Sequence, residues 1–113
     1  MVNRNIDPFL ASVIHGALED IALEMGQKLM RMSYSSIIRE SEDFGTALTD
    51  QTGRQLCECT MSTPLQSGPI PGYVIGVLEE LKGRGDEIKP GDIFMHNDPY
   101  NGASHGPDVG FLV

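Results

Sequence analysis

The stretch that decides the fold is Asp7-Pro-Phe-Leu-Ala-Ser-Val-Ile-His-Gly-Ala-Leu-Glu-Asp-Ile-Ala-Leu-Glu-Met-Gly-Gln-Lys-Leu-Met-Arg-Met32. Asp7 can accept hydrogen bonds from the free N–H groups of a first helical turn, where proline is also well tolerated. Apolar residues then recur every three or four positions. They are Leu10, Val13, Ile14, Ala17, Leu18, Ile21, Met25, Leu29 and Met32. The pattern predicts a helix of about seven turns that ends near Ser33-Tyr-Ser-Ser36.

Shorter elements are expected after this helix. They are strands at 44–49 and 54–60 around an Asp50-to-Gly53 turn, a loop at 61–72, a helix at 73–81, a strand at 93–96, a loop at 97–110 and a strand from 111. Proline and glycine are concentrated at 61–72, which favours irregular structure there. The charged residues at 39–43 are expected to form a solvated turn. Together the elements predict an α+β fold, with the long helix packed on a partly incomplete β-sheet.

Composition excludes several classes of partner. The chain has 113 residues, with 16 acidic against 8 basic side chains, and a formal charge of −8. An acidic surface is unsuited to nucleic acid or to anionic membranes, which bind basic patches. The sequence contains neither an apolar run long enough to span a bilayer nor the apolar core of a secretory signal. We therefore expect a cytoplasmic protein.

The two cysteines, Cys57 and Cys59, lie one residue apart. A ring this small makes a poor disulfide, and two sulfurs alone cannot form a four-sulfur zinc site. We expect both to be reduced residues that pack on one face of a strand.

The end of the chain bears on its domain organisation. Phe111-Leu-Val113 begins an apolar strand, and a helix of 25 residues needs more partner surface than the remaining elements supply. We expect residues 1–113 to be the N-terminal part of a longer domain, truncated at its C-terminal end.

The strongest chemical signal lies between His96 and Val109, which hold two histidines and two aspartates among glycines and prolines. Imidazole and carboxylate ligands suit Zn, Mn or Fe, and His105-x-x-Asp108 can aim both side chains at one ion. A catalytic metal usually has three protein ligands, and the direction of His96 is not fixed by spacing. The alternative is a loop in which these side chains only cap turns. The third histidine, His15, is expected to pack or to face solvent.

The order of motifs resembles the hydantoinase B/oxoprolinase family. The matching motifs are Asp7-Pro8, Ala17–Gly26, Tyr34-Ser35, Asp43-Phe44, Ala47–Asp50, Gly53-Arg54, Lys89–Asp92, Asn97–Tyr100, Gly102, His105 and Pro107–Val109. Family members are several times longer and include subunits that open cyclic amides. The resemblance implies a segment of such a subunit, acting with the rest of its own chain and with a hydantoinase A-type subunit that binds ATP.

The resemblance also implies roles for single residues. His105 and Asp108 correspond to two ligands of a divalent metal (Mn or Zn), while the third, a histidine, lies beyond Val113, which makes His96 a weaker candidate. Asp98 is expected to orient a ligand, and Asn97 and Gly102 to shape the loop. Two alternatives stay open: a subunit of an acetone/acetophenone-type ATP-dependent carboxylase, and a non-catalytic protein that binds partners through the long helix.

Overall fold

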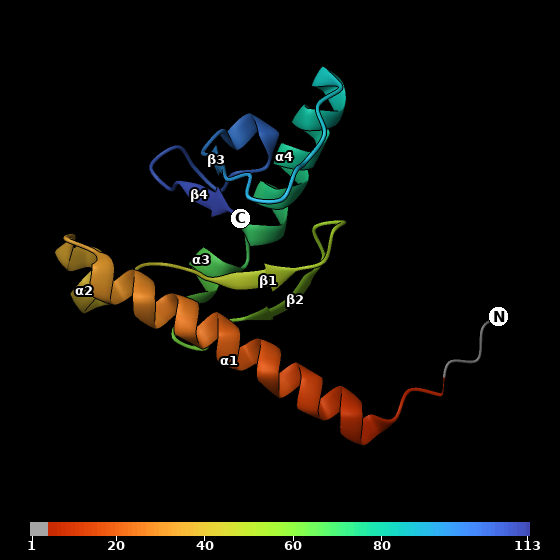
Figure 1. Ribbon diagram of the computed structural model, residues 1–113. Helices are drawn as coiled ribbons and strands as arrows, with labels where there is room; N and C mark the ends of the chain where they lie inside the picture. The colour runs from red at the N-terminus through yellow and green to blue at the C-terminus, as the bar shows by residue number, and fades with distance from the viewer. Residues whose placement is uncertain (1–4) are drawn as a thin grey trace.

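The computed structural model describes residues 5–113, and its elements follow the expected order (Figure 1). They are α1 (Pro8–Met32), α2 (Ser36–Ser41), β1 (Ala47–Thr49), β2 (Gln55–Glu58), α3 (Pro64–Ser67), α4 (Ile70–Arg84), β3 (Phe94–His96), the 3₁₀ helix η1 (Pro99–Asn101) and β4 (Gly110–Leu112). The α+β class is confirmed. Within residues 5–113 the strands form two separate antiparallel pairs, β1–β2 and β3–β4, rather than one sheet.

The long helix begins and ends as predicted. The carboxylate of Asp7 accepts a hydrogen bond from the Phe9 N–H at 2.9 Å, and Pro8 occupies the first turn. At the other end the Ser33 N–H reaches the Leu29 carbonyl at 3.0 Å. In the part of the chain that the structure covers, neither this helix nor any other combines the length and apolarity needed to cross a bilayer.

The face that α1 packs against the β1–β2 hairpin is built from small residues. Ala22 and Gly26 are the buried residues of the helix, and the Thr46 hydroxyl of the segment before β1 donates to the Ala22 carbonyl at 2.8 Å. Ala22 forms a small core with Cys57 and Cys59. The larger apolar residues at the stripe positions Val13, Ile14, Ile21 and Leu29 stay substantially exposed. The long helix thus packs on the β1–β2 hairpin as expected, through Ala22, Gly26 and the partly buried Leu18 and Leu23, while much of the apolar stripe is left uncovered within residues 5–113.

Gly26→Ala is expected to lower the free energy of unfolding by about 1–3 kcal/mol. A Cβ atom at this position would lie 2.8 Å from Cys59 Sγ and 3.0 Å from Phe44 Cε2. Urea denaturation measures the change. Gly16→Ala is the matched control in the same helix, since its Cβ meets nothing within 4 Å and alanine favours the helix. Equal stability of the two variants would contradict the packing described here.

Both cysteines are free and buried, which confirms their predicted role as packing residues. Burial raises the pKa of the Cys57 thiol. The core under α1 therefore uses both cysteines as small apolar side chains.

The Asp50 turn between β1 and β2 is held by the carboxylate of its first residue. Asp50 Oδ1 accepts from the Thr52 hydroxyl at 2.6 Å, the Thr52 N–H at 2.9 Å and the Arg54 N–H at 2.9 Å. Gly53 closes the turn with φ +88°. The hydroxyl of Thr52 and then the backbone N–H of Arg54 lower the pKa of this carboxyl below its ordinary value of 3.8.

A pH dependence follows from the lowered pKa of Asp50. A depressed pKa in the folded state stabilises the fold above the unfolded pKa, and that contribution is lost as the pH falls through the folded pKa. We expect Asp50→Asn to melt at a lower temperature than the unmodified chain at pH 7, and the difference to shrink toward about pH 3. Melting curves across this range measure it. Asp20→Asn, at an exposed position of α1, is the control for the loss of one negative charge.

The segments predicted as a loop at 61–72 and as a turn at 39–43 are partly helical. Pro64 lies in the first turn of α3 and Pro71 in the first turn of α4, where the missing N–H costs nothing. Helix α4 also extends past residue 81 to Arg84, and Gly85 ends it with φ +74°. At 39–43, α2 includes Arg39 and closes through the left-handed Glu42. Pro64, Pro71 and Gly85 therefore mark the ends of helices rather than irregular structure.

Candidate functional site

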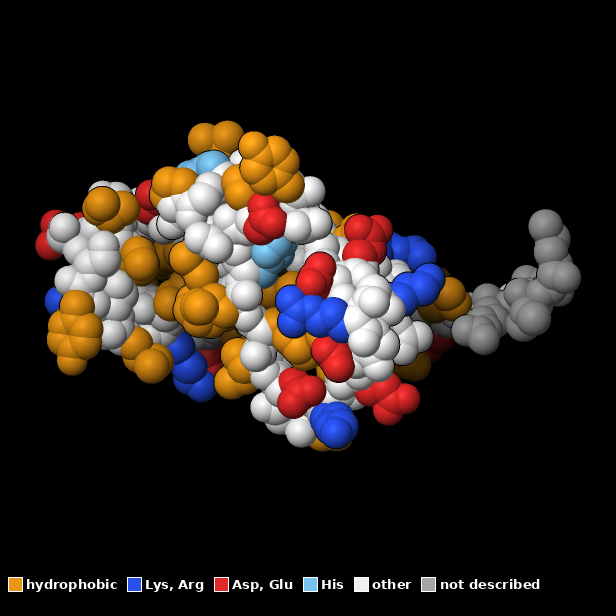
Figure 2. Space-filling view, turned by 90° about the horizontal axis from the view of Figure 1, so that it is seen from above, with side chains coloured by type: hydrophobic (Ala, Val, Ile, Leu, Met, Phe, Trp, Pro, Cys, Tyr) orange, Lys and Arg blue, Asp and Glu red, His pale blue; other side chains and the backbone are white. Residues whose placement is uncertain are grey.

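The loop between β3 and β4 carries the predicted site residues. The two strands pair antiparallel, with His96 opposite Gly110, so the loop leaves and returns at neighbouring positions. Asn97 Nδ2, near the start of the loop, donates a hydrogen bond to the Gly106 carbonyl, near its end, at 2.9 Å. Figure 2, which looks onto the side of α4, β3 and β4, shows histidine side chains reaching the surface there.

Helix α4 holds this loop through two glycines one helical turn apart. A Cβ on Gly72 would lie 2.4 Å from the Gly102 carbonyl oxygen, and one on Gly76 would lie 1.7 Å from the Asn101 carbonyl oxygen. The helix and the loop backbone are therefore in direct contact. The signal in the sequence is Gly72-x-x-x-Gly76, a spacing that lets another backbone approach a helix closely. The predictions made from the sequence did not include this contact.

His96 is used inside the loop. Its Nδ1 accepts from the Asp98 N–H at 3.3 Å, so the ring proton lies on Nε2, which faces the Asn101 carbonyl at 3.0 Å. The ring also stands edge-on to Tyr73, with 5.5 Å between centroids. Both ring nitrogens therefore help to hold the loop in shape.

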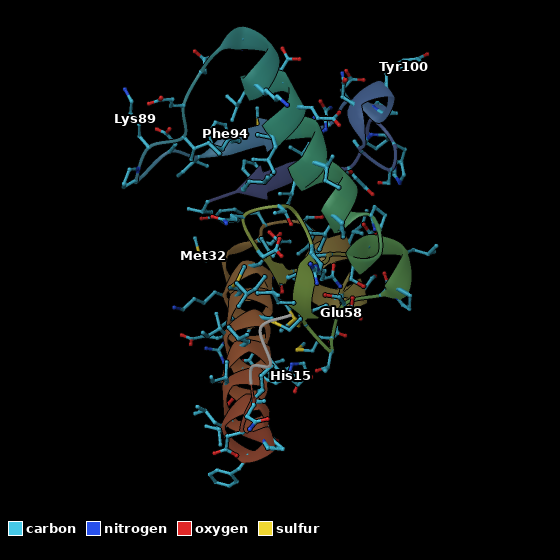
Figure 3. All side chains as sticks on the ribbon, turned by 90° about the vertical axis from the view of Figure 1, so that its right-hand side faces the viewer. His15, Met32, Glu58, Lys89, Phe94 and Tyr100 are labelled. Carbon is cyan, nitrogen blue, oxygen red and sulfur yellow. The ribbon has the colours of Figure 1, made fainter. Side chains whose placement is uncertain are left out.

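Asp98 and Gly102 shape the 3₁₀ turn η1. Asp98 accepts from the Tyr100 N–H at 2.9 Å and from the Asn101 side chain, and Gly102 ends the turn at φ +102°. Tyr100 itself points outward (Figure 3). These hydrogen bonds show that Asp98 stabilises the conformation of the loop. Its predicted role of orienting a metal ligand stays a prediction.

His105 and Asp108 are brought together by a tight turn. The Asp108 N–H reaches the His105 carbonyl at 3.2 Å, and the two side chains face each other, with His105 Nε2 3.0 Å from Asp108 Oδ2. The side chains are 58% and 30% exposed, so the pair is open to a ligand from solvent or from another part of a subunit. Asp108 Oδ2 also accepts from the Ser104 hydroxyl at 3.2 Å.

The geometry of this pair fits two ligands of one ion. Two atoms bound at about 2.1 Å to an octahedral cation lie roughly 3 Å apart, the separation seen here. Within residues 5–113, histidine, cysteine and acidic side chains form no cluster of three or more that could hold a metal. His105 and Asp108 are thus one possible imidazole and one possible carboxylate donor, and their role as metal ligands stays a prediction.

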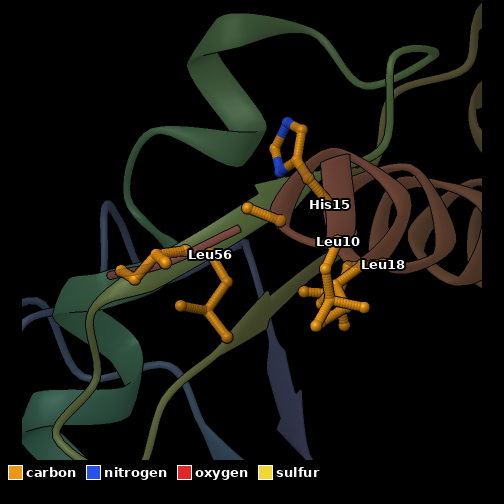
Figure 4. Close-up of a pocket in the computed structure, with 7 residues that line it drawn as sticks. Leu10, His15, Leu18 and Leu56 are labelled. Atoms are coloured by element: carbon orange, nitrogen blue, oxygen red, sulfur yellow. The ribbon is translucent and has the colours of Figure 1, made fainter. Parts of the chain in front are cut away.

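A second surface feature lies on the opposite side of the fold. An open apolar groove of about 350 Å³ runs between the first half of α1 and Leu56 of β2, and Leu10, His15 and Leu18 line it (Figure 4). His15 Nε2 pairs with Glu19 at 3.2 Å, and its side chain is more than half exposed, as expected for a histidine that faces solvent. The groove contains no donor set for a metal among its described lining residues.

Known proteins resemble nearly the whole chain. The sequence profile of the hydantoinase B/oxoprolinase family matches residues 7–113. A protein of Pseudomonas sp. (strain NS671), named as the B subunit of a D-/L-hydantoinase, is 63% identical over 110 residues, covering 97% of this chain and 19% of that protein. The 5-oxoprolinase of Saccharomyces cerevisiae is 32% identical over 105 residues, covering 93% of this chain and 8% of that protein. The caprolactamase beta subunit of Pseudomonas jessenii is 35% identical over 106 residues, covering 90% of this chain and 17% of that protein. The chain spans less than a fifth of the length of each relative. No solved structure matches it.

Proposed function

The chain belongs to the hydantoinase B/oxoprolinase family, and on this premise we propose that it is a segment of a subunit that hydrolyses the C–N bond of a cyclic amide. The observation that carries the proposal is the 63% identity to a protein named as a hydantoinase B subunit. Other relatives are named 5-oxoprolinase and caprolactamase, and each of these names denotes a ring closed by an amide bond.

The proposal includes an ATP-dependent partner of the hydantoinase A type. Two relatives are named as one subunit of an enzyme, B or beta, which implies a second subunit. The resemblance to the family assigns ATP to this partner, and the given sequence itself carries no Gly-x-x-x-x-Gly-Lys motif that would cradle a phosphate.

In the proposed site, His105 and Asp108 hold a divalent metal, Mn or Zn, and the remaining ligand comes from the rest of the subunit. Such an ion polarises a carbonyl oxygen as a Lewis acid. His105 would offer an imidazole nitrogen and Asp108 a carboxylate oxygen, two kinds of donor that suit these ions. Glycines around the pair allow a substrate or another segment to approach the backbone closely.

The test is turnover by the complete subunit that carries this sequence, assembled with an A-type subunit. Hydantoins, 5-oxoproline and caprolactam are supplied with ATP, and ring opening is followed together with ADP release. ATP-dependent opening of one of these rings is the expected result. ATP-dependent carboxylation of acetone or acetophenone without ring opening would favour the carboxylase alternative and overturn the proposal.

The exposed apolar stripe of α1 supports a second candidate, a non-catalytic subunit that binds partners through this helix. Val13 and Ile14 are 52% and 51% exposed, whereas Leu18 packs against the core. Val13→Asp is therefore the informative variant, because Leu18→Asp would also disturb folding. Under this candidate Val13→Asp abolishes co-purification with the partner and His105→Ala has no effect; under the enzymatic proposal His105→Ala abolishes turnover.

A further inference from the structure

We propose that Tyr73 and Ser104 are positioning residues for Asp108, acting as a short chain of hydroxyl groups that runs from helix α4 to the carboxylate. The inference rests on the proposed metal site and extends it to two residues outside the His105-x-x-Asp108 motif. Tyr73 lies 31 residues before Ser104 in the sequence, yet its hydroxyl is 3.0 Å from Ser104 Oγ.

The direction of the hydrogen bonds follows from the chemistry of the groups. An ionised carboxylate only accepts, so the Ser104 hydroxyl donates its single proton to Asp108 Oδ2 at 3.2 Å. In the contact between the two hydroxyls Tyr73 must then be the donor. The same Tyr73 hydroxyl lies 3.3 Å from the Asp108 carbonyl oxygen, so its proton is shared between Ser104 and the backbone of Asp108.

The Tyr73 ring is held in place by packing, so the first hydroxyl group of the hydrogen-bonded series has a fixed position. The residue is only 7% exposed, although its side chain ends in a hydroxyl that needs a hydrogen-bond partner when buried. Its ring packs edge-on to His96 of β3, and a Cβ on Gly110 of β4 would lie 2.5 Å from the ring atom Cδ1. The phenol is thus held by both strands that carry the loop.

The arrangement has a consequence for ligand binding. Asp108 is partly exposed and sits in a glycine-rich turn, so without an anchor its side chain would sample several rotamers. The hydroxyl chain fixes the carboxylate beside His105 before an ion arrives, which lowers the ordering cost of binding. Hydrogen bonds that orient a metal-binding carboxylate are typically worth about 10–100-fold in metal affinity.

The experiment measures Mn²⁺ binding by the complete subunit, with the metal alone as probe and bound Mn²⁺ followed by calorimetry and by its electron paramagnetic resonance signal. Tyr73→Phe and Ser104→Ala are each expected to weaken binding about tenfold. Both substitutions interrupt the same series of hydrogen bonds to Asp108. The double variant should therefore bind Mn²⁺ about as weakly as either single variant. Ser104→Thr keeps the hydroxyl and is expected to bind nearly as the unmodified protein does.

Two controls separate this inference from the proposed function. Tyr34→Phe removes a hydroxyl from a fully exposed tyrosine and should leave Mn²⁺ affinity unchanged. His105→Ala should lose binding. If His105→Ala loses binding while Tyr73→Phe and Ser104→Ala bind normally, the positioning role is overturned and the metal site stands. If His105→Ala binds Mn²⁺ normally, the metal site and the positioning role both fall.

Discussion

Gly76→Ala is expected to lower the free energy of unfolding by about 3 kcal/mol or more, the largest stability effect anticipated for a single added methyl group in this chain. The new Cβ would lie 1.7 Å from the backbone oxygen of Asn101 and 2.9 Å from His96 Nε2. Neither neighbour can yield cheaply, because the oxygen belongs to the backbone and His96 is held from both ring nitrogens. Helix α4 and the loop must therefore separate. Urea denaturation measures the loss.

Gly83→Ala is the control for this variant. Gly83 lies in the same helix, and a Cβ there meets nothing within 4 Å. Alanine favours a helix interior over glycine, so Gly83→Ala is expected to stabilise the chain by about 0.5–1 kcal/mol. Opposite signs for the two substitutions would support direct contact between α4 and the loop. Stabilisation of similar size by both substitutions would show that only the helix propensity of alanine matters at Gly76, and would contradict the contact with the loop.

His105→Ala and Asp108→Ala are each expected to reduce turnover of the assembled enzyme by at least about a hundredfold. Their donor atoms are 3.0 Å apart, and removal of either leaves a single protein ligand from this loop. Ring opening of the substrate found for the parent complex measures the effect, and metal content of the purified variants shows whether the ion is lost with the activity.

The control for the two ligand variants is His15→Ala. This histidine is exposed on α1 and pairs only with Glu19 among the described contacts, so turnover should be unchanged. Co-purification with the partner should be retained in all three variants. Normal turnover by both ligand variants would remove His105 and Asp108 from the site, whereas loss of assembly would indicate a structural role for the loop.

Local chemistry made much of this fold predictable. The Asp7 cap, the serine at the end of α1 and the Asp50-to-Gly53 turn all depend on hydrogen bonds between residues at most four apart. Such contacts form wherever the right residue types occur in the right order. The meeting of His105 with Asp108 is of the same kind, since one tight turn places residues i and i+3 face to face. The sequence therefore determined the long helix, the hairpin turn and the donor pair.

Tertiary structure decided which surfaces meet. Periodicity marked the apolar stripe of α1 as a packing face, but not which part of it the hairpin would cover. The hairpin lies over Ala22 and Gly26, with Leu18 and Leu23 partly buried beside them. The proline-rich stretch at 61–72 was predicted as a loop, but it contains α3 and the first turn of α4. Proline is found both in loops and in the first turn of a helix, so its presence alone does not distinguish the two. The link from Tyr73 to Ser104 depends on α4 docking its glycine face on a loop some 30 residues away. The spacing Gly72-x-x-x-Gly76 indicates that some backbone can approach α4, but not which one, because the partner is fixed only when the helix and the loop pack together.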